Sequence, residues 1–149
     1  MTKNKSTDEL ISDIKDTREI DTFLQENKAA LHFPSIAEYL NTHRLAKQLS
    51  CASLARASNL TRAYIQQIMT GQKSAPSRNT LLCIALAMKL SYEETVLLLK
   101  YAQAGPLYPR NPSDSIIMHS LRHEISLIDT ELKLAEHGLP PLSSAREGA

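Results

Sequence analysis

One side of a short predicted helix, residues 62–70, carries side chains that can read the edges of nucleic acid bases. At about 100° of rotation per residue, Arg62, Ala63, Gln66 and Gln67 share an arc of roughly 140°. Arginine can pair with guanine and glutamine with adenine through two hydrogen bonds each, and a small alanine lets a helix enter a groove. These residue types favour contact with bases, although two exposed glutamines are also compatible with an ordinary helix surface.

The opposite side of the same helix is apolar. Tyr64, Ile65 and Ile68 fall between roughly 200° and 300° on the helical projection, so they are expected to face the protein interior. The sequence therefore predicts a helix that is held by its apolar side and presents its arginine and glutamines to a partner.

A second short helix, residues 51–57, comes just before the first. Ala55 is small at the point where two such helices would cross, and Asn59 is the best non-glycine residue for a left-handed turn between them. Thr61 is placed to cap the helix at residues 62–70. Residues 50–71 are therefore predicted to form a helix-turn-helix.

Charge is distributed unevenly along the chain, although the net charge is only +1. Residues 1–34 hold five bases against seven acids, residues 35–105 eight against three, and residues 106–149 four against six. Within residues 35–90, seven bases face the single acid Glu38. Such a basic zone is what a polyanion-binding surface requires, but charge alone is equally compatible with a solvated face.

Other classes of protein find little support. No apolar run approaches the roughly 18 to 20 residues needed to cross a bilayer, and the N-terminus has no secretory signal pattern, so a cytoplasmic protein is expected.

Cys51 and Cys83 have neither disulfide-framework nor zinc-cluster spacing. His119 and His123 have a possible metal-binding spacing, but a packed or solvent-facing pair is the preferred interpretation. Without a phosphate loop, nucleophile elbow or carboxylate cluster, no enzyme activity, cofactor or metal is expected.

The whole chain is expected to be all-α, since helical periodicity dominates and only four glycines are available for hairpin turns. A serine with an acid three residues later predicts a reciprocal helix cap at four places: Ser6 with Glu9, Ser35 with Glu38, Ser91 with Glu94, and Ser126 with Asp129. Predicted helices cover residues 6–30 with a break near Asp16, then 35–47, 51–57, 62–70, 78–89, 92–102, 114–123 and 127–137. Residues 105–112 hold three prolines and a glycine and are expected to form a rigid linker.

Residues 35–102 resemble the lambda-repressor-like, XRE-type family of helix-turn-helix regulators. The likeness rests on Leu54 and Ala55, on Thr61, Ile65 and Ile68, on the Gly71 stop, on Pro76-Ser77, and on the following LLCIALAMKLSYEET segment. It implies a five-helix DNA-binding domain at residues 35–105, between an acidic segment, residues 1–34, and a helical extension, residues 106–149. Asn59 replaces the family's usual turn glycine, and Cys51 stands where glutamine is common.

The resemblance also implies site roles. Arg62, Ala63 and Gln67 occupy places that face base edges, and Cys51, Ser53, Thr61, Thr70 and Lys73 occupy places that contact phosphates. Lys73 and Arg78 are expected to add phosphate contacts, since they flank the base-reading helix. The expected function is a sequence-specific regulator of transcription, a repressor binding a palindromic operator as a homodimer.

Two questions stay open at this point. The apolar faces of the last two predicted helices either enlarge the core or form a surface for a second copy or a protein partner. The chain as a whole is also compatible with a protein-interaction adaptor and, among regulators, with an antitoxin that represses its own operon.

Overall fold

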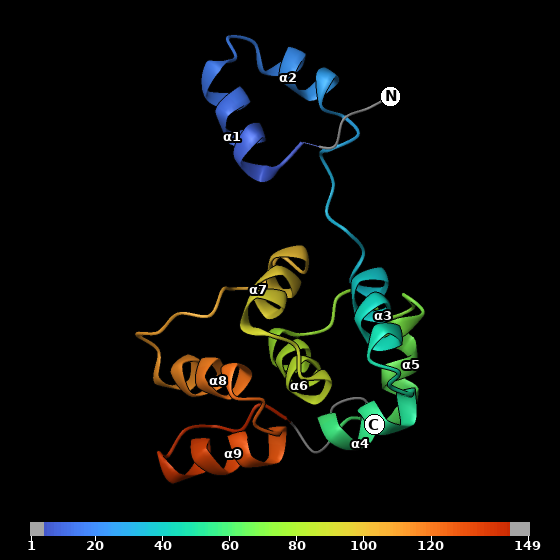
Figure 1. Ribbon diagram of the computed structural model, residues 1–149, viewed down its shortest axis with the longest axis vertical. Coiled ribbons are helices and arrows are strands. Elements are labelled where there is room, and N and C mark those ends of the chain that lie inside the picture. The colour runs from blue at the N-terminus through green and yellow to red at the C-terminus, as the bar shows by residue number, and fades with distance from the viewer. Residues whose placement is uncertain (1–4, 144–149) are drawn as a thin grey trace. The chain divides into compact units, whose positions relative to one another are not determined.

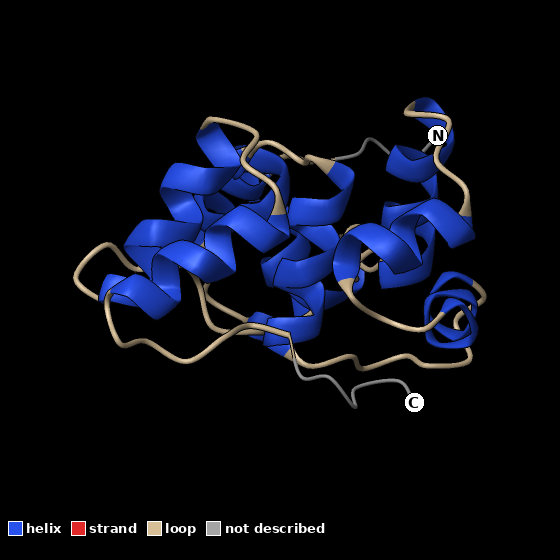
Figure 2. Ribbon diagram, turned by 90° about the horizontal axis from the view of Figure 1, so that it is seen from below, coloured by secondary structure: helices blue, strands red, loops and turns tan. Residues whose placement is uncertain are grey.

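The computed structural model describes residues 5–143. Within them the regular secondary structure is entirely α-helical, with loops joining the helices (Figure 2). These residues form nine α-helices and no strand, which confirms the all-α prediction. None of these helices is both long and apolar enough to span a membrane. Two compact units are present, Met1–Phe33 and Pro34–Ala149.

The N-terminal unit is a small pair of helices, α1 (Thr7–Asp16) and α2 (Ile20–Glu26). The predicted break is present, since α1 ends at Thr17. Phe23 is the buried apolar side chain of this unit, and the Asn27 side chain donates a 2.9 Å hydrogen bond to its carbonyl. Ile11, Ile14, Ile20 and Leu24 are exposed within the unit.

The second unit is arranged around α6 (Arg78–Met88), in which eight residues are buried. This helix packs against α4 (Cys51–Ser58) and α7 (Tyr92–Tyr101), while α5 (Arg62–Met69) packs on α4 and on α3 (Ile36–Ala46) (Figure 1). Because α6 is apolar on nearly every side, it can serve as the common support for the helices around it.

The chain continues into α8 (Pro112–Arg122) and α9 (Leu127–Glu136), which pack on each other and on α6. Ile117, Leu121, Leu127 and Leu134 join the same core as the preceding helices. The C-terminal helices therefore enlarge the core, the first of the two alternatives. Ile128 and Leu132 lie one turn apart on α9 and are exposed, so a free apolar strip also exists.

Every predicted helix is present with its ends within a few residues of the expected positions. The largest difference in the second unit is at α8, which begins two residues early because Asn111 caps it and Pro112 takes the first helical position. Proline suits that position because its missing N–H would have no helical partner there.

Candidate nucleic-acid interface

The turn between α4 and α5 has the predicted geometry. Asn59 adopts a left-handed backbone (φ 58°, ψ 33°), and the next amide, Leu60, donates to the Ala55 carbonyl at 3.2 Å. Thr61 is the N-cap of α5, and its hydroxyl accepts from the Tyr64 amide at 3.1 Å. Ala55 is buried where α4 is held in the core, so the tight turn depends on its small side chain.

The two sides of α5 differ as the sequence predicts. Ile65 and Ile68 have no exposed surface, and Tyr64 is half-buried against the core. The four base-reading candidates, Arg62, Ala63, Gln66 and Gln67, are all exposed. The structure thus brings these four side chains together on one accessible helix surface, which we call the α5 outer face.

The C-terminal end of α5 is held from a neighbouring helix. The Asn41 side-chain amide on α3 donates to the Met69 carbonyl at 2.6 Å, while Arg44 donates to Asn41 at 3.2 Å and to the Leu49 carbonyl at 3.0 Å. These bonds fix α5 relative to α3 without using any residue of the α5 outer face. Sequence reasoning missed Asn41, and its only signal was an amide on a largely apolar helix.

The seven bases of the basic zone, residues 35–90, divide into two groups. Four donate hydrogen bonds within the protein: Arg44, Lys47, Arg78 and Lys89. Within the described part of the chain, the side chains of Arg56, Arg62 and Lys73 have no hydrogen bond or ion pair to another residue. These three belong to α4, α5 and the loop that follows α5. Within the basic zone, the charge that is not used inside the protein therefore lies on the helix-turn-helix and on the loop that follows it.

The polar candidates for phosphate contact lie at helix ends. Ser53 takes part in a reciprocal cap with Ser50, which sequence analysis had not predicted, and Cys51 is half-buried at the first position of α4. The Thr70 hydroxyl donates weakly to the Gln67 carbonyl at 3.3 Å. Cys51 and Ser53 lie in the first turn of α4 and Thr61 is the N-cap of α5, and the amides of helix N-termini attract anions.

Lys73 extends from the loop after α5. Its backbone amide donates to the Gln67 carbonyl at 2.9 Å, which orders the loop. With Ser35 and Ser74 it lines a hollow of about 300 Å³ beside the start of α3. An unpaired ammonium group at such a place can meet a phosphate that lies across the helix-turn-helix.

Arg78 does not share this freedom, although the sequence suggested it as a phosphate contact. Its guanidinium donates to the Gly105 carbonyl at 2.8 Å and to the Pro106 carbonyl at 3.1 Å, and it forms a 3.0 Å ion pair with Asp114. The arginine therefore holds the proline-rich linker and α8 against the start of α6. We remove it from the set of phosphate contacts for this reason.

The remaining titratable cluster has a structural explanation. Tyr39 donates to the Glu94 carbonyl at 2.8 Å, and burial, followed by the charge of Glu94, raises the pKa of Tyr39 to about 12. His43 lies 3.2 Å from the Glu94 carboxylate. The cluster joins α3 to α7, and a tyrosine with so high a pKa is a poor proton donor or acceptor near neutrality.

Residues 5–143 contain no group of side chains arranged for metal binding or for thiol chemistry. His119 and His123 pack with their ring centroids 4.4 Å apart, as the preferred interpretation had it, and no group of three potential ligands gathers within these residues. Cys51 is half-buried, Cys83 is fully buried, and neither forms a disulfide.

No family model, curated protein or solved structure matches this chain. The site is therefore interpreted from its own geometry. The α5 outer face is exposed and includes Arg62, while Arg56 on α4 and Lys73 on the loop after α5 have side chains without a partner among residues 5–143.

Proposed function

We propose that this protein is a sequence-specific double-stranded DNA-binding regulator of transcription, a repressor that occupies a palindromic operator as a homodimer. In this proposal residues 35–105 form a lambda-repressor-like domain, and α5 enters the major groove. Arg62, Gln66 and Gln67 read base edges, while Ala63 permits close approach.

One observation supports this proposal above the others. The α5 outer face is exposed, and the bases of the zone whose side chains have no partner among the described residues, Arg56, Arg62 and Lys73, lie on or next to the same helix-turn-helix. A merely solvated helix would more typically carry a mixture of lysine and glutamate. Phosphate contacts then fall to Lys73 and to the helix-end residues Cys51, Ser53, Thr61 and Thr70.

Selection of bound duplexes from a random pool, using the full chain, tests the proposal. A preferred sequence should emerge, and Arg62→Ala or Gln67→Ala should each weaken binding to it by about 1 to 3 kcal/mol while relaxing base choice at one position. Arg110→Ala and Gln25→Ala change the same residue types at other exposed positions and should leave affinity unchanged. Equal losses on selected and scrambled duplexes for Arg62→Ala would contradict base reading.

A homodimer follows from the same proposal, since a palindromic operator presents two equivalent half-sites. Ile128 and Leu132 on α9 supply exposed apolar surface that a second copy could bury. Sedimentation of the full chain measures this directly: Leu132→Asp should shift the equilibrium toward the monomer and weaken binding to a two-half-site operator more than to a single half-site.

A protein-interaction adaptor is the second candidate, and one observation favours it. Five large aliphatic side chains of the N-terminal unit are exposed, although Phe23 is the only buried apolar residue among the unit's described residues, 5–33. An adaptor should show little nucleic-acid binding, whereas a DNA-binding protein that neutralises several phosphates loses affinity steeply as salt rises. An antitoxin repressing its own operon would share the DNA chemistry and additionally bind its toxin.

A further inference from the structure

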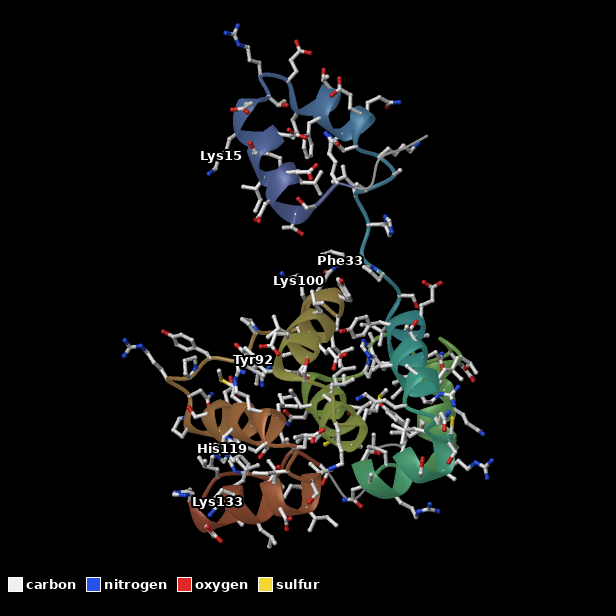
Figure 3. All side chains as sticks on the ribbon, viewed as in Figure 1. Lys15, Phe33, Tyr92, Lys100, His119 and Lys133 are labelled. Carbon is white, nitrogen blue, oxygen red and sulfur yellow. The ribbon has the colours of Figure 1, made fainter. Side chains whose placement is uncertain are left out.

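A groove with an apolar floor runs between α8 and α9. These helices form an antiparallel hairpin (Figure 1). The groove has a volume of about 530 Å³. Its lining includes Ile116, Ile125, His119, Asp129, Lys133 and His137. Figure 3 marks His119 on α8 and Lys133 on α9, which line the groove from its two sides. Pockets of roughly 300 to 1,000 Å³ with apolar walls and a few polar groups are typical of small-molecule sites.

The charges along the groove are ordered. Asp129, Lys133 and His137 follow one another at intervals of four residues, so they form a single stripe along the α9 wall. Asp129 is in the first turn of α9, near the loop that joins the two helices. Lys133 and His137 are farther from that loop. Because α8 runs antiparallel and the Thr130 hydroxyl donates to the Ser120 hydroxyl at 2.8 Å, His119 lies level with the stripe between Asp129 and Lys133. The stripe therefore begins with an acid and continues with a lysine and a histidine.

We propose that this groove binds a small organic acid with an apolar body. Ile116 and Ile125 would receive the body, and Lys133 would receive the acid group with help from the imidazoles of His119 and His137. The ammonium of Lys133 is paired with Glu136 at 2.9 Å, but both side chains are more than half exposed. Exposed pairs contribute little free energy, so a ligand carboxylate can replace Glu136 at small cost.

The two walls of the groove are each attached to an element that flanks α5 along the chain: the α8 wall to the start of α6, and the α9 wall to the turn between α4 and α5. On the α8 wall, Asp114 precedes the lining residues and is ion-paired with Arg78 at the start of α6. On α9, Glu131 accepts from the Ser143 hydroxyl at 2.7 Å, and Ser143 accepts from the Asn59 side chain at 3.2 Å. Asn59 and Arg78 lie on either side of α5 along the chain. A ligand that changed the separation of α8 and α9 would therefore act, through these two connections, on the elements that flank α5.

A ligand in the groove is therefore expected to lower the affinity for DNA. This effect rests on the proposed function, whereas the binding of the ligand to the groove does not depend on it. Allosteric couplings between two sites are commonly worth a change of about fivefold or more in affinity. The affinity of the groove for a ligand and the effect of that ligand on DNA affinity are therefore measured separately.

The first measurement is a fluorescence titration of the full chain, without DNA, using two probes. Anilinonaphthalene sulfonate has an apolar body and an anionic group, and N-phenyl-1-naphthylamine has the same body without the charge. Lys133→Glu and the milder Lys133→Gln should weaken sulfonate binding, the former by about tenfold, and should leave the neutral probe unaffected. Lys100→Glu, an exposed lysine on α7, is the matched control. Unchanged sulfonate affinity in both Lys133 variants would overturn the proposal.

The second measurement is binding to the selected duplex with and without the sulfonate probe, at a concentration that saturates the wild-type chain but not the Lys133→Glu chain. The wild-type chain should lose about fivefold in DNA affinity. The Lys133→Glu chain should lose much less, because the probe occupies its groove to a smaller extent. Ser143→Ala should bind the probe normally but show a smaller effect on DNA, because the connection to Asn59 is cut. If the probe binds the groove yet DNA affinity does not change, the coupling is refuted, while a chain that binds no duplex refutes the proposed function alone.

Discussion

The guanidinium of Arg78 lies 3.0 Å from the carboxylate of Asp114, and the two residues belong to the first turns of α6 and α8. The Asp114 side chain is only 6% exposed and also accepts from the Tyr108 amide at 3.0 Å. A buried carboxylate is costly unless it is paired and hydrogen-bonded, and here both conditions are met. The ion pair thus makes the C-terminal helices part of the unit that carries α5.

Arg78→Lys should lower the free energy of unfolding by about 1 to 2 kcal/mol, because an ammonium group cannot reproduce the fixed fork that serves Asp114 and two carbonyls. Urea denaturation measures the change. Arg56→Lys, at an exposed position without a described partner, should shift stability by less than about 0.5 kcal/mol. An Arg78→Lys variant of normal stability but weakened DNA binding would return Arg78 to the phosphate contacts.

Lys73→Ala should weaken binding to selected and scrambled duplexes by the same factor, because an ammonium group on a phosphate carries no sequence information. The slope of log affinity against log salt should fall by about one. Titrations at several salt concentrations give both quantities. Lys28→Ala removes an exposed lysine of the N-terminal unit and serves as the control. A loss confined to the selected duplex would mean that Lys73 reads a base.

Much of the fold could be predicted from the sequence because the signals are local. The αL turn at Asn59, the Thr61 cap and the buried isoleucines of α5 depend on residues within one or two turns of each other, and all are confirmed. The caps were predicted less completely. Each of the four serine hydroxyls accepts from an amide three residues later. The reciprocal bond, in which the acid accepts from the serine's backbone amide, is formed only at Glu94 among the described caps.

The long-range parts could not be predicted from local pattern. Arg78 looks like any surface base until α8 brings Asp114 to it from 36 positions away. Asn59 meets Ser143 across 84 positions, and Asn41 meets Met69 across 28. Such partners depend on how helices pack, so spacing along the chain carries no signal of them. The basic zone was therefore overestimated: four of its seven bases serve internal acceptors.

Asn59→Ala should reduce the free energy of unfolding by about 1 kcal/mol, since a left-handed backbone is costly for alanine and the bond to Ser143 is lost. Asn59→Gly loses the same side-chain bond but tolerates the backbone, so it should be more stable than Asn59→Ala. Thermal or urea unfolding of the two variants and of Ser143→Ala separates the effects. Equal stability of the alanine and glycine variants would show that the turn carries no strain.

Glu94 should make stability depend on pH in the acid range. Its carboxylate accepts from the Ser91 amide at 2.8 Å, and this bond, with a smaller effect from nearby His43, holds the pKa of Glu94 below its ordinary value of 4.5. A lowered folded-state pKa means that the charged form stabilises the protein. This contribution is complete above pH 4.5 and is lost as the pH falls through the folded-state pKa.

Glu94→Gln should therefore lower the free energy of unfolding by about 1 kcal/mol at neutral pH, the usual contribution of a helix cap. The difference from wild type should shrink as the pH falls below about 4.5, because protonation weakens the same bond in the wild-type chain. Glu38→Gln is the matched control: Glu38 has the same third position in α3, where the Ser35 hydroxyl bond is formed but the described cap has no reciprocal bond. Urea unfolding at a series of pH values compares the two variants, and a difference for Glu94→Gln that does not change with pH would assign its effect to packing between α3 and α7 instead of to the charge.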